Sequence, residues 1–202
     1  MVMIHAQLVG ALSFLIVTVI IGFAIRRTPT REAAHRLSRV SHAFFWGGMV
    51  APELLGALWP GLTRFDALLG LPPLPGNWVR WLVGVPLLLV GALFTSASMG
   101  ALRRLGSGLM AFKLTKRVVD EQVYQRVRNP MSLGVYLQFV GVSLLVGSSY
   151  LLLATILVYI PVHAFNLLYF EELELSARHG PSYDEYRQKV PFLIPRLRLP
   201  RS

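Results

Sequence analysis

The feature that most constrains this chain is a series of apolar runs long enough to cross a lipid bilayer. The first run, residues 8–25, carries no charged side chain and is followed by Arg26 and Arg27. Crossing a hydrocarbon core of about 30 Å takes roughly 20 helical residues, so this run can nearly span it. Similar runs cover residues 42–59, 78–99, 131–146 and 150–170. The sequence therefore predicts an all-α integral membrane protein with about five transmembrane helices.

The composition indicates one membrane domain over residues 1–202. The chain is 54% hydrophobic and 15% charged, with a mean hydropathy of +0.54, whereas soluble domains carry about 25% charged residues. We expect three transmembrane helices in residues 1–100 and the functional core in residues 101–202. Because the chain has no cysteine, disulfides, thiolate metal sites and a cysteine nucleophile are excluded. We predict no metal site.

Local patterns refine this arrangement of helices. Pro52 and Glu53 lie near the middle of the second run and predict a kink with a polar inner face. The Pro-rich residues 71–77 predict a tight turn before the third helix. Only Gly147, Ser148 and Ser149 separate the last two runs, and a joint this short requires an antiparallel hairpin.

The distribution of cations predicts the orientation in the membrane. Of the 20 Lys and Arg residues, 18 lie in segments 26–41, 100–130 and 171–202, and such residues are retained on the cytoplasmic side. We therefore expect an inner-membrane protein with its N-terminus outside and its C-terminus in the cytoplasm. Since the cations lie between apolar runs, membrane lipids are the expected partners and nucleic acid is not. The oligomeric state stays open.

The segment before the fourth run can bind an anion. Asn129 is a suitable N-cap and Pro130 suits the first helical position, so the helix should begin here, with Arg128 at the headgroup level. A helix N-terminus beside an arginine suits a carboxylate or phosphate. The alternative is that these three residues only mark where the helix enters the membrane.

Three carboxylates, Glu171, Glu172 and Glu174, follow the fifth run. Carboxylates at a helix C-terminus oppose the helix dipole, so their placement is unfavourable unless a cationic or hydroxylated group binds there. The alternative is a solvated helix end. Gly180 and Pro181 should end this helix, and residues 182–185 read as a capping box for a short C-terminal helix that runs to about Lys189.

Taken together, these segments resemble a known family. The pattern Tyr124-x-x-x-Arg128-Asn129-Pro130-Met131-x-x-Gly134, a hairpin, Glu171-Glu172 and then Gly180-x-x-Tyr183-x-x-Tyr186-x-x-x-Val190-Pro191 is similar to the membrane methyltransferases. That superfamily includes isoprenylcysteine carboxyl methyltransferase and the phospholipid N-methyltransferases. The resemblance covers about residues 103–196, which makes residues 101–202 a methyltransferase-like core.

The resemblance implies transfer of a methyl group from S-adenosylmethionine, bound on the cytoplasmic side, to a lipid or another hydrophobic small molecule. It also implies which residues bind the cofactor. They are Lys116, Arg117, Val118, Val119, Tyr124, Arg128, Asn129, Pro130, Met131, Ser132, Glu171 and Glu172.

The chain departs from the family pattern at three of its positions. Asn129 replaces the usual His, Ser132 replaces a frequent Tyr, and Leu167 replaces the Arg that binds substrate in the prenylcysteine enzymes. The loss of that cation argues against a carboxylate substrate.

Three polar residues inside the apolar runs are candidates for catalysis. Glu53, His163 and Asn166 should face a cavity or a partner, because polar groups are costly at membrane depth. Glu53 or His163 can accept the proton of an amine substrate. The alternative is that these residues only form hydrogen bonds between helices. Two rival functions stay open: an NADPH-dependent membrane reductase, and a non-catalytic carrier or scaffold.

Overall fold

The computed structural model describes residues 2–58, 62–74, 76–106, 120 and 122–195. These residues form helices and no strand, which confirms the predicted all-α membrane protein. The α-helices are α1 (Val2–Arg27), α2 (Arg31–Phe44), α3 (Ala51–Leu58), α4 (Leu62–Leu69), α5 (Asn77–Ala101), α6 (Pro130–Val146), α7 (Ser149–Ala154), α8 (Ile160–Asn166), α9 (Glu172–His179) and α10 (Pro181–Lys189). A 3₁₀ turn, η3 (Gln122–Gln125), precedes α6.

Several of these helices are segments of longer ones joined by π-helical turns. The turn η1 (Phe45–Val50) joins α2 to α3, η4 (Thr155–Tyr159) joins α7 to α8, and η5 (Leu167–Glu171) joins α8 to α9. A further π turn, η2 (Leu102–Gly106), follows α5. The irregularity predicted at Pro52 takes this form, since η1 ends just before α3 begins.

Three of the described helices are long and apolar enough to cross a membrane: Val2–Arg27, Trp78–Arg104 and Ser149–His179. The helix Pro130–Val146 is apolar but shorter. The described part of the second predicted run, residues 42–58, lies in the helix that α2, η1 and α3 build, and this helix begins earlier than predicted, at Arg31. The charged residues of α2, from Arg31 to Arg39, precede that run in sequence.

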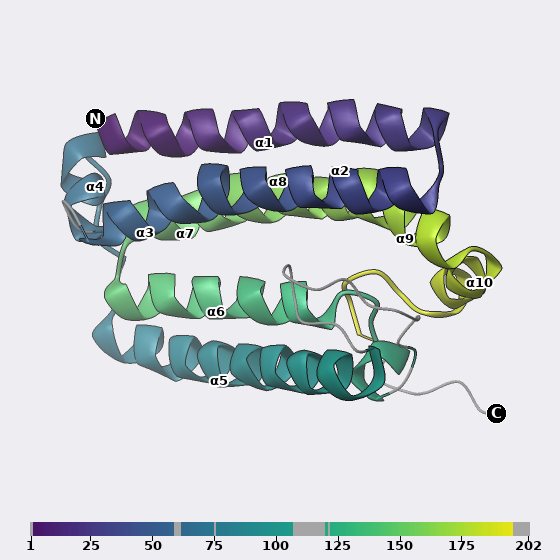
Figure 1. Cartoon of the computed structure of the whole chain (residues 1–202). Coiled ribbons are helices and arrows are strands. Elements are labelled where there is room, and N and C mark those ends of the chain that lie inside the picture. The colour runs from purple at the N-terminus through teal and green to yellow at the C-terminus, as the bar shows by residue number, and fades with distance from the viewer. Residues whose placement is uncertain (1, 59–61, 75, 107–119, 121, 196–202) are drawn as a thin grey trace.

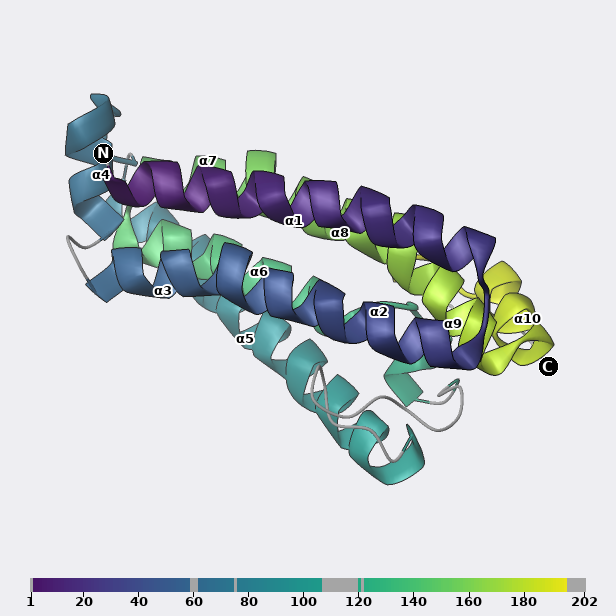
Figure 2. The same ribbon diagram turned by 45° about the horizontal axis from the view of Figure 1, so that its top comes forward.

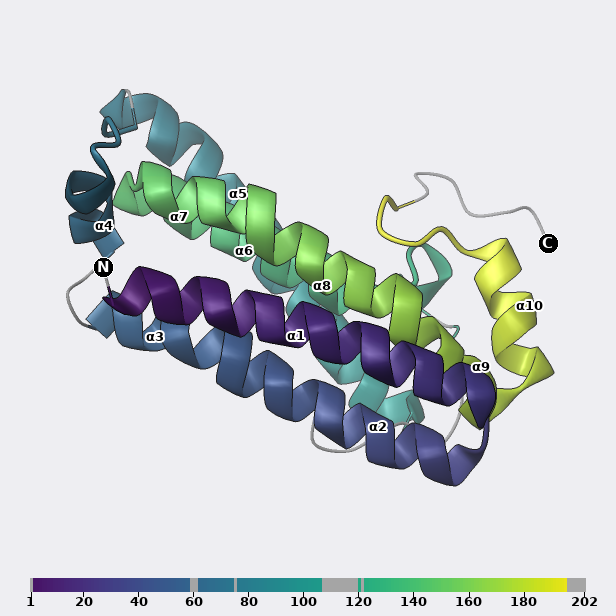
Figure 3. The same cartoon turned by 90° about the horizontal axis from the view of Figure 1, so that it is seen from above.

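The helices form two layers (Figure 1). One layer holds α1, the α2–α3 helix and the α7–α9 helix, and the other holds the α5–α6 hairpin. Seen from above, α1 lies between the α2–α3 helix and the α7–α8 segment (Figure 3). Figure 2 shows that α5 runs at an angle to α1. The N-terminus and α4 lie at one end of the bundle, and α9 and α10 lie at the other (Figure 1).

Glycines allow α5 and α6 to pack closely. A Cβ atom on Gly134 would stand 2.5 Å from Thr95 Oγ1 and 2.7 Å from the Gly91 carbonyl oxygen, so only glycine fits there. The Gln138 amide also donates to Thr95 Oγ1 at 2.7 Å, which satisfies an intramembrane polar group across the same contact. These two helices therefore form a hairpin of fixed register.

The predicted joint between α6 and α7 is confirmed as an antiparallel turn. Gly147 ends α6 with φ 76°, a left-handed conformation that favours glycine. The Ser148 hydroxyl caps α7 by accepting from the Leu151 N–H at 3.1 Å. The short helix α4, which was not predicted, adds a second cap, because Asp66 Oδ1 accepts from the Tyr150 N–H at 2.6 Å.

Two predicted caps are wrong in detail. Helix α6 does begin at Pro130, but the Asn129 side chain makes no cap bond and its amide donates to the Phe192 carbonyl at 3.3 Å. Helix α10 begins at Pro181, behind Gly180, and no side chain caps it. The Ser182 hydroxyl instead donates to the His179 carbonyl at 2.9 Å. In both cases a neighbouring carbonyl competes for the capping side chain.

Candidate functional site

A single cavity of about 440 Å³ runs between the two layers. Its walls come from the α2–α3 helix, the first half of α6 and the α7–α9 helix, and its polar end is completed by Tyr124, Tyr183 and Tyr186. The cavity therefore joins segments far apart in the sequence. Asn129 and Glu171 both line it, which confirms that the α6–α7 hairpin brings the two polar segments together.

The two π turns explain how one helix lines the whole cavity. At about 100° per residue, a regular α-helix would leave Thr155 and Glu171 about 160° apart around its axis. Each π turn accommodates one additional residue and so reduces the angle between these two side chains by about 100°. The turns η4 and η5 thus bring Glu171 to within about 40° of Thr155. Both side chains line the cavity, together with His163 between them.

The polar end of the cavity contains most of the predicted cofactor residues. Lining residues from this set are Tyr124, Arg128, Asn129, Pro130, Met131, Ser132 and Glu171. Lys116, Arg117, Val118 and Val119 lie outside the described residues. Glu172 is absent from the lining and belongs to an ion pair behind it.

The C-terminal segment holds the start of α6 in place. The Arg128 N–H donates to the Pro191 carbonyl at 2.9 Å, and the Asn129 N–H donates to the Phe192 carbonyl at 3.3 Å. The Arg128 guanidinium also lies 5.7 Å from the centre of the Phe192 ring. Residues 191–192 thus act as a strap across the N-terminus of α6. This explains why the Asn129 side chain bonds to the strap and does not cap the helix.

The three carboxylates after the fifth run have different surroundings. Glu172 pairs with Arg128 at 2.5 Å and with Arg187 at 3.7 Å. Glu174 pairs with Arg178 at 2.5 Å, and both side chains are almost fully buried. Glu171 lines the cavity, and the charge of the nearby Arg178, which pairs with Glu174, also acts on it. Glu171 and Glu174 both line the cavity, and Glu174 is held in a close ion pair, so Glu171 is the carboxylate more available to a ligand.

Tyrosines close the polar end beside this carboxylate. The Tyr186 hydroxyl donates to the Tyr124 carbonyl oxygen at 2.8 Å, which fixes α10 against η3. Burial raises the pKa of Tyr124 well above its usual range, and the nearby Glu171 carboxylate raises it further. Burial likewise raises the pKa of Tyr183. Both phenols therefore stay neutral at physiological pH and can donate hydrogen bonds.

The inner part of the cavity contains two pairs of polar side chains. His163 Nδ1 lies 2.8 Å from the Tyr136 hydroxyl, and its ring stacks on Phe45 with 4.8 Å between ring centres. One helical turn away, the Tyr159 hydroxyl donates to the Glu53 carboxyl group. The first pair joins α8 to α6 and the second joins the same helix to α3. The surrounding side chains are mostly apolar, including Phe139 and Met49.

Comparison with known proteins identifies the family. A family model described as phospholipid methyltransferase matches residues 79–180, about half of the chain. The chain belongs to the phospholipid methyltransferase family. The matched region begins in α5 and ends at Gly180, so it contains both helices of the close-packed hairpin and the predicted core up to α10. The resemblance drawn from the sequence motifs is confirmed.

One curated relative of this methyltransferase family member is methanethiol S-methyltransferase 2 of Bradyrhizobium diazoefficiens. The two proteins are 37% identical over 75 residues, which cover 37% of this chain and 27% of the relative. The chain thus aligns with little more than a quarter of that protein. No solved structure matches the chain.

Asn166 holds the methyltransferase bundle together. Its amide nitrogen donates to Thr18 Oγ1 at 2.9 Å and to Ser41 Oγ at 3.2 Å, so it connects three helices. Asn166 borders the cavity, but these two bonds use its donors. These hydrogen bonds give Asn166 a structural role. They do not test its predicted catalytic role.

Sequence reasoning missed Tyr136, Tyr159 and Thr155, which line the cavity of this family member. A signal for two of them was present, because Thr155 and Tyr159 precede His163 at intervals of four residues. Such spacing places side chains on one face of a helix. Tyr136 had no comparable signal, since its position opposite His163 depends on how α6 packs.

Proposed function

We propose that this protein transfers a methyl group from S-adenosylmethionine to a lipid or another hydrophobic small molecule at the cytoplasmic face of the membrane. The observation that carries the proposal is the shared cavity, in which Asn129 and Glu171 form one polar end and apolar side chains form the rest. Membership of the phospholipid methyltransferase family supports the methyl transfer. The apolar lining supports a hydrophobic acceptor.

The residues at the polar end fit the charged groups of the cofactor. No described side chain caps α6, and Met131 and Ser132 in its first turn line the cavity. Such a helix N-terminus suits a carboxylate. Glu171 suits an ammonium group or ribose hydroxyls, because Glu172 and Glu174 are already paired with arginines. S-adenosylmethionine, when bound, supplies an electrophilic methyl group on a sulfonium centre.

The chain's own residues position the reactants, exclude water and accept a proton. Aromatic side chains such as Phe45 and Phe139 keep the inner cavity apolar, and alignment in a dry site is the main requirement of a displacement reaction. When His163 Nδ1–H donates to the Tyr136 hydroxyl, the ring is held in place and Nε2 carries the lone pair that accepts a proton from a protic acceptor.

The nature of the acceptor follows from the lining and from the relative. Leu167, where the prenylcysteine enzymes carry an arginine, is buried and lines the cavity, so no cation meets a carboxylate acceptor there. The Bradyrhizobium relative is named for methanethiol, a small apolar thiol. Leu54, Trp46 and Phe139 line the cavity but are 60%, 38% and 41% exposed. The cavity can therefore receive an acceptor from the bilayer.

Binding of S-adenosylhomocysteine tests the donor site. Calorimetry in detergent should show binding to the wild-type protein, and Glu171→Gln or Asn129→Ala should weaken it about tenfold. Glu171→Gln removes the charge that a cofactor ammonium group would meet, and Asn129→Ala removes the side-chain hydrogen bond that holds the Phe192 strap against the start of α6. Glu185→Gln is the matched control, since the Glu185 side chain is 71% exposed and its ion pair among the described residues is with Lys189 at 3.9 Å. Unchanged binding in both site variants would contradict the assignment.

A labelling experiment tests the reaction itself. The pure protein is incubated with methyl-labelled S-adenosylmethionine and either a total lipid extract or a small alkyl thiol, and the labelled product is identified. We expect one of these acceptors to carry the label. Binding of NADPH without S-adenosylhomocysteine would favour a reductase, and binding of neither would favour a carrier or scaffold.

A further inference from the structure

The inner end of the cavity lies far from the proposed donor site. At a rise of about 1.5 Å per residue, Tyr159 is about 18 Å from Glu171 along the helix, and Thr155 is about 24 Å from it. His163 is nearer, at about 12 Å. The Glu53–Tyr159 pair is therefore too far along the cavity to meet the reacting atom of an acceptor whose methyl donor lies beside Glu171.

Thr155 marks this inner end as a binding site. Its side chain is 1% exposed and lines the cavity, and its hydroxyl has no hydrogen-bond partner among the described residues. Two other helical hydroxyls, those of Thr95 and Ser143, are satisfied by the carbonyl four residues earlier. Thr95 donates to Gly91 at 3.0 Å, and Ser143 donates to Phe139 at 2.6 Å. Thr155 stands in the π turn η4 and makes no such bond.

The charge at this end restricts what can bind. Thr155, Tyr159 and Glu53 line it, with Leu151 closing the apolar side. The arginines that border the cavity, Arg128 and Arg178, come from the far end of the helix and from the start of α6. The Glu53 carboxyl group accepts from Tyr159 and can accept a second hydrogen bond. Among the described lining residues, an anionic group would meet a carboxyl group and no cation at this end, so the site suits a hydrogen-bond donor.

We propose that Glu53, Thr155 and Tyr159 form a second binding site, which recognises an O–H or N–H group at the far end of an elongated acceptor. This inference rests on the proposed function, because it assumes that the ligand is the methyl acceptor. It deepens that function by specifying the acceptor's shape. The acceptor has its methylated atom near His163 and a hydroxyl or amine at its other end. Glu53 is then a recognition residue, and His163 accepts the proton.

Photolabelling can locate such a group. Three probes share a ten-carbon chain with a diazirine near one end, and that end terminates in a hydroxyl, an amine or a methyl group. Each is added to the full chain in lipid nanodiscs, and labelled peptides are identified by mass spectrometry. We expect the hydroxyl or the amine probe to label the turn around Thr155 at least fivefold more than the methyl probe, in line with one buried hydrogen bond.

Variants show whether the polar side chains cause the preference. Thr155→Val should reduce it about fivefold, whereas Thr155→Ser, which keeps the hydroxyl, should retain it. Ser143→Ala is the control, because Ser143 is a buried helical hydroxyl outside the cavity. Glu53→Gln should reduce labelling by the amine probe more than labelling by the hydroxyl probe, which separates the two sources of the hydrogen bond.

The photolabelling result tests the second site separately from the proposed donor site. Equal labelling of the Thr155 turn by all three probes, or a preference that survives Thr155→Val, would overturn the second site even if S-adenosylhomocysteine binds. If labelling shows the preference but S-adenosylhomocysteine does not bind, the second site stands and the proposed methyl transfer fails. Each Thr155 variant is checked for folding by thermal unfolding in the same nanodiscs.

Discussion

A polar residue in this bundle can stabilise the fold, take part in the chemistry, or do both. Asn166 was predicted to be catalytic, and its two hydrogen bonds to Thr18 and Ser41 make it a test case. A residue that only connects helices contributes to stability. One that also contacts the reactants contributes to turnover.

We expect Asn166→Leu to lower the free energy of unfolding by about 1 kcal/mol, because interhelical hydrogen bonds in membranes are individually modest. S-adenosylhomocysteine binding should stay within about twofold of wild type. Thermal unfolding in detergent and calorimetry check both quantities. Unchanged stability with lost methyl transfer would instead return Asn166 to the catalytic residues.

The Arg128–Glu172 pair should be far more sensitive than a surface pair. Both side chains are 11% exposed, so Arg128→Met leaves a buried carboxylate without its main partner and should cost about 2 kcal/mol or more. Arg36→Met is the control, because Arg36 and Glu32 are 68% and 81% exposed and such pairs contribute about 0–1 kcal/mol. Chemical denaturation of the two variants measures the difference. Equal losses would show that the buried pair has no special role.

Helix packing makes a prediction at the level of elements. Gly134→Ala places a methyl group against Thr95 and Gly91 and should destabilise the α5–α6 hairpin by about 2 kcal/mol. Gly47→Ala is the matched control, since a Cβ there meets nothing within 4 Å. Because alanine has a higher helix propensity than glycine, the stability of Gly47→Ala should equal that of the wild type or be slightly higher. The unfolding temperatures of both variants in one detergent decide the matter, and a loss in Gly47→Ala of similar size would refute the packing argument.

The sequence predicted these elements unevenly, for physical reasons. Apolar runs and the Gly147 joint are local signals, so α1, α5, α6 and the α6–α7 hairpin were predicted closely. The π turns have no composition of their own, and without them Glu171 could not be assigned to the same helix face as Thr155. The use of Asn129 by Phe192 depends on a contact 63 residues away in sequence. Such competition between caps and distant carbonyls cannot be read from local patterns.

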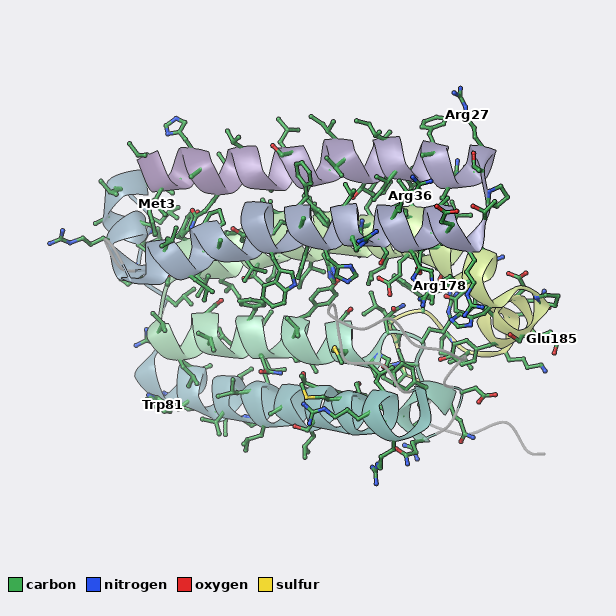
Figure 4. The ribbon with its side chains drawn as sticks, in the orientation of Figure 1. Met3, Arg27, Arg36, Trp81, Arg178 and Glu185 are labelled. Carbon is green, nitrogen blue, oxygen red and sulfur yellow. The ribbon has the colours of Figure 1, made fainter. Side chains whose placement is uncertain are left out.

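At the scale of the whole molecule, charge sorts to one end of the bundle. Figure 4 shows Arg27, Arg36, Arg178 and Glu185 at one end, whereas Met3 and Trp81 lie towards the other. The predicted orientation places the first group in the cytoplasm. The candidate site lies at that charged end, because Arg178 lines it.

Because the chain has no cysteine, single cysteines can report this orientation without a mutated background. We expect Glu185→Cys to react with a membrane-impermeant maleimide only after the cell is opened. Met3→Cys should react in intact cells, which serves as the matched control for probe access. The reverse pattern would place the donor site on the outer face and contradict the proposed use of a cytoplasmic cofactor.

The strap formed by residues 191–192 has a consequence for biosynthesis. A polypeptide emerges from the ribosome from its N-terminus onward, so α1 and the helices that follow it emerge before Pro191 and Phe192 do. Until these two residues pair with Arg128 and Asn129, the start of α6 lacks its strap. We therefore expect α6 to reach its final position only after Phe192 has left the ribosome.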